Sequence, residues 1–92
     1  MEFEWDPEKA RINLAKHGVP FELASFVFSD EFRTEEIDDF VVYGEERWKA
    51  VGQAKGQFYA VIYTQRGDFT RIISARRATR YEQQNYLQQN SP

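Results

Sequence analysis

The sequence predicts an α+β domain in which two short helices precede a three-stranded antiparallel meander and one further helix follows it. Three apolar segments rich in aromatic and β-branched residues, roughly 47–53, 57–64 and 69–75, have the composition of strands. Short turns that each contain a glycine, at 54–57 and 65–68, separate them. Because turns this short join antiparallel neighbours, the three segments are expected to form one continuous sheet.

The residues before the meander predict a short edge strand and then a helix. Phe3-Glu4-Trp5 alternates apolar and polar side chains, as an edge strand does. Asp6 is a suitable N-cap and Pro7 suits the first helical position, whereas Gly18 is a suitable C-terminal stop. The apolar stripe of this helix is expected to hold Ala10, Leu14 and His17, with Asn13 beside them.

A second short helix is expected to begin at Pro20 and to form a helical hairpin with the first, lying on the sheet. Its stripe would be Phe21, Ala24 and Phe28. The acidic stretch 29–46 predicts a connection with at most a short extended piece. The last helix should begin at the capping box formed by Thr79 and Glu82, and the tail 88–92 should fray.

Length and composition favour one cytoplasmic domain, 1–92, without a metal site. The 92 residues include eight Phe, five Tyr and two Trp, so large rings build the core. The absence of cysteine excludes disulfides and thiolate metal sites, and a single histidine makes an imidazole zinc site improbable. No apolar run reaches the roughly 20 residues that span a bilayer, and no signal peptide opens the chain.

Charge is divided unevenly along the chain. Residues 1–46 carry 4 Lys and Arg against 13 Asp and Glu, and residues 47–92 carry 8 against 2, which together give the net charge of −3. One interpretation is a basic working surface with an acidic one facing elsewhere. The alternative is that the acidic residues only solubilise surface helices.

Lys16 and His17 are candidates for proton transfer or phosphate contact at the end of the first helix. Histidine is the commonest general acid or base. The structural alternative is a packed histidine, or one that interacts with the helix dipole, beside a solvated lysine.

Arginines cluster around the last hairpin and the helix that follows it. A guanidinium donates bidentately and therefore suits a phosphodiester. Arg71 and Arg76 should project from opposite faces of a regular strand, so both join one patch only where the strand twists or bulges. Salt bridges to the acidic half of the chain are the alternative use. The set comprises Arg66, Arg71, Arg76, Arg77 and Arg80.

Several motifs, in order and with family-like spacing, resemble the BrnT toxin family. They are Phe3-Glu4-Trp5-Asp6-Pro7-Glu8-Lys9, Asn13-Leu14-Ala15-Lys16-His17-Gly18-Val19, Glu46-Arg47-Trp48, Val51-Gly52, Val61-Ile62-Tyr63-Thr64, Ile72-Ile73-Ser74-Ala75-Arg76 and Ala78-Thr79. The resemblance covers nearly the whole chain except 29–45 and the tail after Tyr86. That tail is rich in glutamine, whereas the family is usually basic there.

The resemblance implies a RelE-like fold and a ribonuclease toxin of a BrnT/BrnA type II toxin–antitoxin pair. RNA cleavage without metal or cofactor would halt translation, and a BrnA-type antitoxin would neutralise the toxin. Promoter DNA would be bound only through the antitoxin complex. Exposed aromatics predict an apolar surface that the antitoxin or a second copy covers, so both a homodimer and a heterotetramer with the antitoxin stay open.

Residue chemistry and family-like positions together assign the expected roles. Lys16, His17, Arg76 and Arg80 are the catalytic candidates, and Arg47, Arg66 and Arg77 are candidates for contacting RNA phosphates. Cleavage also needs an acid–base pair, which Glu82 or Tyr81 could complete. The alternative function is a non-catalytic interaction module, a relic toxin that binds its antitoxin or RNA without cutting.

Overall fold

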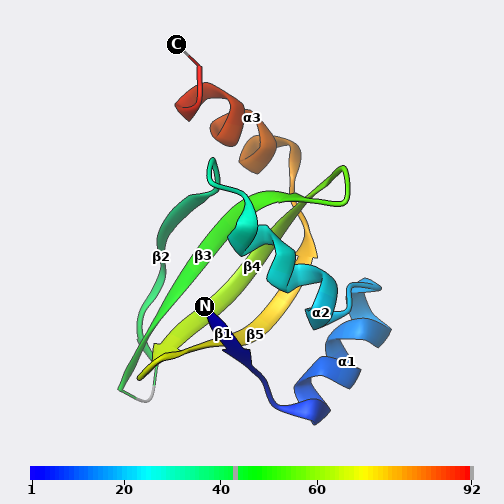
Figure 1. Cartoon of the computed structure of the whole chain (residues 1–92), viewed down its shortest axis with the longest axis vertical. Coiled ribbons are helices and arrows are strands. Elements are labelled where there is room, and N and C mark those ends of the chain that lie inside the picture. Colours follow the sequence, from blue (N-terminus) through cyan, green and yellow to red (C-terminus); the bar gives the residue numbers. More distant parts are fainter. Residues whose placement is uncertain (43, 92) are drawn as a thin grey trace.

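The fold is a five-stranded mixed sheet with helices on both faces and at one edge (Figure 1). The computed structural model describes the backbone of residues 1–42 and 44–91, and the side chains of the same residues apart from 39–42. The sheet has the strand order β1-β5-β4-β3-β2, and only β1 runs parallel to its neighbour, β5. The α+β class is confirmed. No helix in the described part of the chain is long and apolar enough to span a membrane.

The three predicted strands are confirmed, each slightly longer than expected. They are β3 (Glu45–Ala54), β4 (Gln57–Arg66) and β5 (Phe69–Arg77), and β4 runs antiparallel to both of the others. Lys55 and Gly56, the two residues between β3 and β4, have φ of 51° and 79°. Two successive positive φ values define the type I′ turn, which matches the twist of a two-residue hairpin.

The prediction of a connection over 29–46 is wrong, because half of this stretch forms strand β2 (Thr34–Val42) and its last two residues begin β3. β2 pairs antiparallel with β3 and is the edge of the sheet, opposite β1 (Glu2–Glu4). Acidic residues have low β propensity and hid the strand in the sequence. On an edge strand, however, charged side chains are common because they discourage pairing with other chains.

Helix α1 (Pro7–His17) has the predicted bounds but not the predicted buried stripe. The Asp6 side chain accepts a hydrogen bond from the Glu8 amide, and Gly18 ends the helix with φ 71°. Leu14 is 48% exposed and His17 is exposed, whereas Asn13 is buried. The Asn13 amide donates to the carbonyls of Val19 and Ala75 and accepts from the Ala75 amide. This polar clamp fixes α1 against the edge of β5.

The predicted second helix and helical hairpin are only partly present. Helix α2 (Phe21–Ala24) is a single turn that continues into a 3₁₀ helix, η1 (Ser25–Ser29). These two elements cross one face of the sheet, while α1 lies beside β5 (Figure 1). The core lies between η1, α2 and that face, and consists of Val19, Phe21, Ala24, Val27, Phe28, Ala50, Ala54, Tyr59, Val61, Tyr63, Ile72 and Ala75.

Helix α3 (Arg80–Gln89) begins at the predicted capping box and lies over the opposite face. Only Glu82 and Tyr86 of this helix are buried. Tyr86 packs edge-on against Phe58, in a small second core with Val51, Ala60 and Ala78. This arrangement covers one end of the second face and leaves the rest of it without a helix.

Candidate nucleic-acid interface

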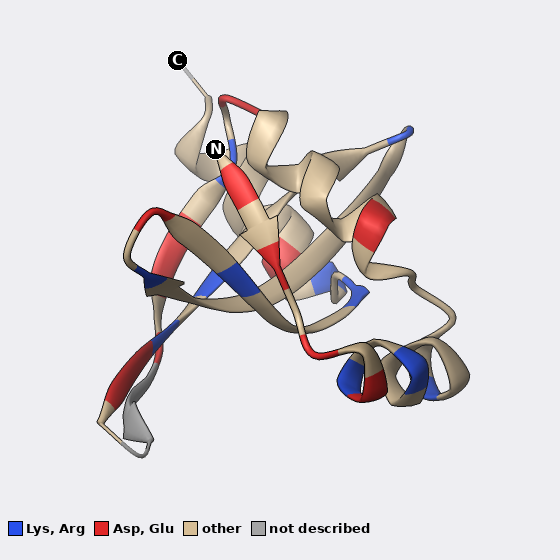
Figure 2. Cartoon of the chain, turned by 60° about the horizontal axis from the view of Figure 1, so that its bottom comes forward, with Lys and Arg blue, Asp and Glu red and all other residues tan. Residues whose placement is uncertain are grey.

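The face of the sheet opposite α2 and η1, called the open face below, carries cross-strand rows that mix charged, polar and apolar side chains. Residues that pair across neighbouring strands share a face. One row reads Thr34, Val51, Ala60, Arg76; the next reads Glu36, Lys49, Ile62, Ser74. Arg47 precedes Lys49 by two residues, so it belongs to the same face of β3. Figure 2 shows Lys and Arg segments on the strands of the sheet with Asp and Glu segments close to them.

A bulge in β5 brings Arg71 and Arg76 onto the same face. The register of β4 and β5 shifts between Ile62 and Tyr63, which pair with Ser74 and Ile72, so Ile73 is the additional residue. Arg71 pairs with Thr64 and Arg76 pairs with Ala60, and both partners project from one face of β4. The sequence left open whether the two arginines share a face, and the structure shows that they do, although their partners Ala60 and Thr64 are four residues apart along β4.

The most elaborate contact on the open face is a buried carboxylate between two cations. Glu82, 6% exposed, accepts from Arg76 through both oxygens, at 2.7 and 2.9 Å, and from Lys49 Nζ at 2.8 Å. The Thr79 amide donates to the same carboxylate at 2.9 Å. The capping box of α3 therefore anchors Arg76 and Lys49 from two different strands.

The charges in this cluster stabilise one another. The bidentate hydrogen bond from Arg76 holds the pKa of Glu82 well below its ordinary value. Burial raises this pKa, but the hydrogen bonds from Lys49 and the Thr79 amide also lower it. Burial lowers the pKa of Lys49, but hydrogen bonds to Glu82 and Glu36 outweigh it, and the pKa lies above its ordinary value. A carboxylate with so little affinity for a proton is a poor general base. We therefore assign Glu82 to anchoring rather than to proton transfer.

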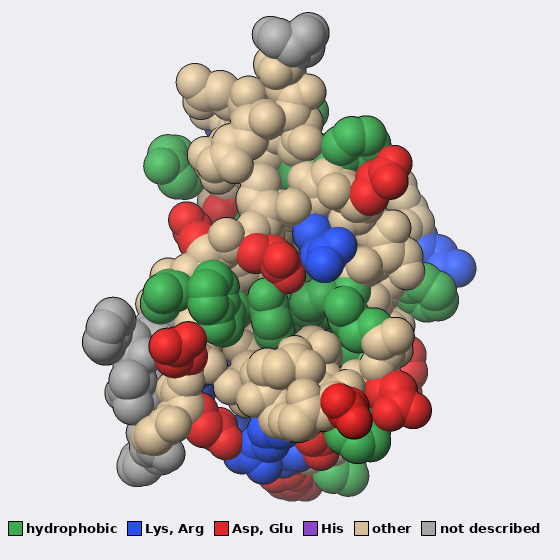
Figure 3. Space-filling view, turned by 60° about the vertical axis from the view of Figure 1, so that its left-hand side comes forward, with side chains coloured by type: hydrophobic (Ala, Val, Ile, Leu, Met, Phe, Trp, Pro, Cys, Tyr) green, Lys and Arg blue, Asp and Glu red, His purple; other side chains and the backbone are tan. Residues whose placement is uncertain are grey.

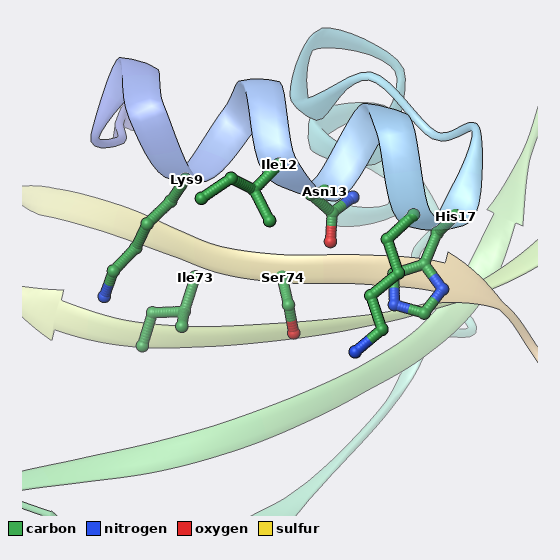
Figure 4. Close-up of a pocket in the computed structure, with 7 residues that line it drawn as sticks. Lys9, Ile12, Asn13, His17, Ile73 and Ser74 are labelled. Atoms are coloured by element: carbon green, nitrogen blue, oxygen red, sulfur yellow. The ribbon is translucent and has the colours of Figure 1, made fainter.

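A cavity between α1 and β5 adjoins the open face and contains both predicted proton-transfer candidates (Figure 4). Its volume is about 190 Å³, and it is lined by Lys9, Ile12, Asn13, Lys16, His17, Ile73 and Ser74. His17 is exposed there, at the C-terminal end of α1, so it is not a histidine packed in the core. Figure 4 shows Lys9 and His17 extending from α1 toward the side of β5 on which Ile73 and Ser74 lie.

Ser74 connects this cavity to the cation cluster. Ser74 and Arg76 lie on one face of a strand that is regular between them, so they are roughly 7 Å apart along β5. Lys49 lies in the same cross-strand row as Ser74, two strands away. Lys16 and His17 therefore border the same surface as Arg76 and Lys49.

Two predicted phosphate contacts, Arg66 and Arg77, lie away from this cluster, and the catalytic candidate Arg80 takes no part in the hydrogen bonds described for the Glu82 carboxylate. Arg66 is at the far end of β4, where it forms an ion pair with Glu45 at 2.7 Å. Arg77 lies over the ring of Tyr59, a residue of the core face, and bonds the side chain of Gln57. Arg80 is exposed at the first residue of α3. Tyr81, the other acid–base candidate, is 76% exposed on that helix.

The uneven charge of the sequence does not become a division between two surfaces. Arg71 pairs with Glu4 at 3.1 Å, and Lys49 pairs with Glu36 at 3.1 Å, so acidic residues of the first half contact cations of the second. The expectation that the acidic stretch faces elsewhere is therefore wrong for Glu36. The alternative use of the cations, in salt bridges to the acidic half, is observed for these two and for Arg66.

Sequence reasoning missed Lys49, Glu36 and Ser74 as neighbours of the site. The alternation Arg47, Lys49, Val51 within a predicted strand was a usable signal for Lys49. Glu36 had no such signal, because its strand was read as a connection. Among the described residues, no three His, Cys, Asp or Glu side chains come close enough together to hold a metal ion.

Comparison with known proteins places the chain in a family. The search of curated proteins finds no match. A family model described as "Ribonuclease toxin, BrnT, of type II toxin-antitoxin system" matches residues 5–82, which include α1, the whole meander and the first residues of α3. The matched segment is well over half of the 92 residues. The protein thus belongs to the BrnT family of ribonuclease toxins of type II toxin–antitoxin systems.

Proposed function

We propose that the protein is a metal-independent endoribonuclease that cleaves RNA on the open face and thereby inhibits translation in the cytoplasm. The observation that carries the proposal is the adjacency of an exposed histidine and lysine, in the α1–β5 cavity, to the cation pair Arg76 and Lys49. Family membership supports ribonuclease activity and an antitoxin partner.

The proposed chemistry is attack of the RNA 2′-hydroxyl on the adjacent phosphorus, with loss of the 5′-oxygen. The reaction needs a base for the 2′-hydroxyl, cations near the phosphorane and an acid for the leaving oxygen. His17 and Lys16 supply the proton-transfer groups in this proposal. Arg76 supplies positive charge to the non-bridging oxygens in this proposal, and Arg47 would contact a phosphate farther along β3. Arg66, Arg77 and Arg80 would contact phosphates farther along the RNA.

The proposed partner is a BrnA-type antitoxin, and promoter DNA would be bound only by the toxin–antitoxin complex. An exposed apolar surface supports a protein partner. Viewed from the side of β2, the molecule carries a band of hydrophobic side chains between acidic ones (Figure 3). Phe26, Phe32, Ile37 and Leu87 are each about half exposed.

One observation favours a second candidate, a non-catalytic module that binds RNA or antitoxin without cleavage. Arg76 already donates to Glu82 through both terminal nitrogens, so part of its capacity for phosphate is used inside the protein. Under this alternative the open face would be a binding surface only.

Growth arrest distinguishes the two candidates. We expect induced expression in a bacterium to stop growth and to deplete full-length mRNA, and co-expression of a cognate BrnA-type antitoxin to restore both. A His17→Gln variant that melts like the wild type should not arrest growth. Unimpaired growth with the wild-type protein present at high level, together with intact mRNA, would favour the binding module.

A further inference from the structure

The ammonium group of Lys49 lies between two carboxylates, one buried and one exposed. Nζ is 2.8 Å from Glu82 Oε2 and 3.1 Å from Glu36 Oε1. The Glu82 side chain is 6% exposed, the Lys49 side chain 17%, and the Glu36 side chain 62%. Lys49 is therefore fixed from the protein side by a buried anion and covered on the solvent side by an exposed one.

The two contacts differ in how easily another anion can replace them. Glu82 is also held by Arg76 and by the Thr79 amide, so leaving its position would break several charge-assisted hydrogen bonds. Glu36 is on edge strand β2, and exposed ion pairs of this kind contribute little. An ammonium carries three donors, and those not used by Glu82 can turn to a new acceptor.

We propose that Lys49 is a binding position for an RNA phosphodiester and that Glu36 is a displaceable carboxylate which competes with the RNA for it. Glu82 acts as a positioning residue that keeps the ammonium at the surface of the sheet when Glu36 is displaced. This inference rests on the proposed function, because it takes RNA as the ligand of the open face.

The place of Lys49 in the sheet fits a strand of RNA that crosses the open face toward the cavity. The row Glu36, Lys49, Ile62, Ser74 runs across β2, β3, β4 and β5 and ends at the residue that lines the α1–β5 cavity. At the usual spacing of strands, Lys49 is roughly 10 Å from Ser74. A phosphate at Lys49 would thus belong to the same RNA as the bond cleaved beside Lys16 and His17.

Binding is measured with a fluorescent single-stranded RNA whose riboses all carry 2′-O-methyl groups, because this probe has no free 2′-hydroxyl to attack. We expect Lys49→Met to weaken binding about tenfold, the cost of one charge-assisted contact. In a plot of log affinity against log salt concentration, the slope should become shallower by about 0.7, because one phosphate contact is missing. Glu36→Gln should tighten binding by roughly two- to fivefold, since it removes a weak exposed competitor.

The double variant Glu36→Gln/Lys49→Met separates competition at Lys49 from general repulsion. If Glu36 acts by occupying Lys49, Glu36→Gln has no effect once Lys49 is methionine. Glu22→Gln is the matched control: Glu22 is an exposed carboxylate on α2, which lies on the other face, and its loss should leave affinity unchanged. Thermal melts report folding, and Glu36→Gln is informative even if Lys49→Met is unstable.

Unchanged affinity in a folded Lys49→Met protein, or an equal gain from Glu36→Gln with and without Lys49, would overturn the inference. Failure of the proposed function gives a different result. If the wild-type protein binds the methylated RNA in this Lys49-dependent way but leaves unmodified RNA intact, the result supports the phosphate site and contradicts the nuclease function. A wild-type protein that does not bind the probe would overturn the phosphate site.

Discussion

At the scale of single residues, Arg76 serves two purposes at once. The Arg76 side chain is 38% exposed on the open face, where we propose that it contacts a phosphate, and it is also the principal partner of the buried Glu82. Removal of its side chain therefore does more than remove a surface charge.

We expect Arg76→Ala to lower the free energy of unfolding by about 1–3 kcal/mol, because a buried acceptor loses its charged donor. Lys49 remains beside Glu82 and limits the loss. Arg76→Ala/Glu82→Gln should recover part of the stability, since no unpaired charge stays behind. Urea unfolding of the three proteins measures this. Equal stability of Arg76→Ala and wild type would show that the Glu82 pair is energetically irrelevant.

The same pair predicts a loss of stability in acid. Because the folded protein holds the pKa of Glu82 below its ordinary value of 4.5, the unfolded chain takes up a proton first as the pH falls. The contribution of Glu82 is complete above pH 4.5 and declines below it. We expect the unfolding free energy of the wild type to fall more between pH 5 and pH 3 than that of Glu82→Gln. Parallel pH profiles would contradict this.

At the scale of elements, α1 depends on a polar contact where an apolar stripe was predicted. Asn13 is buried and makes three hydrogen bonds, of 3.0, 2.9 and 3.1 Å, that tie α1 to Val19 and to the edge of β5. The helix carries two of the residues on which the proposed chemistry depends, Lys16 and His17.

We expect Asn13→Ala to destabilise the protein by about 1–3 kcal/mol, because the Ala75 amide and two carbonyls lose their partner. Leu14→Ala, at the adjacent and half-exposed position, should cost far less, and serves as the control. Chemical unfolding gives the free energies, and amide hydrogen exchange of Ala75 reports the local opening. Similar losses in both variants would indicate that general packing of α1, rather than the Asn13 clamp, holds the helix.

The elements that the sequence predicted well are those whose signals are local. Asp6, Gly18 and the Thr79–Glu82 capping box mark helix ends within a few residues, and the two glycine turns mark the hairpins. β2 was missed because an edge strand needs little apolar character. The contact of Glu82 with Arg76 and Lys49 follows from the packing of α3 on the sheet. No pattern within one segment indicates such a contact.

At the scale of the whole molecule, the fold brings opposite charges together where the sequence separates them. Among the described residues, four cations of the second half of the chain form ion pairs with carboxylates. In three of these pairs the carboxylate belongs to the first half of the chain. The open face is consequently not a uniformly basic platform. The proposed binding of RNA on this face would exchange exposed carboxylates for phosphates, and low salt would favour it.

Arg11→Ala provides a test of whether the position of charge matters more than its amount. Arg11 is an exposed cation of α1 that pairs with Glu8 on the same helix. We expect its loss to leave RNA binding within about twofold of the wild type, because exposed pairs outside the binding surface contribute little. Fluorescence anisotropy with the methylated RNA measures this. A decrease as large as that of Lys49→Met would indicate binding by net charge alone.

The central claim is that this chain cleaves RNA without metal, with His17 and Arg76 at the site. The direct measurement incubates purified protein with end-labelled RNA in excess EDTA and identifies the ends of the products. We predict that the wild type cleaves the RNA and leaves 2′,3′-cyclic phosphate and 5′-hydroxyl ends. Folded His17→Gln and Arg76→Lys variants should cleave it about 10²–10³-fold more slowly. Cleavage abolished by EDTA, or undiminished in both variants, would contradict the claim.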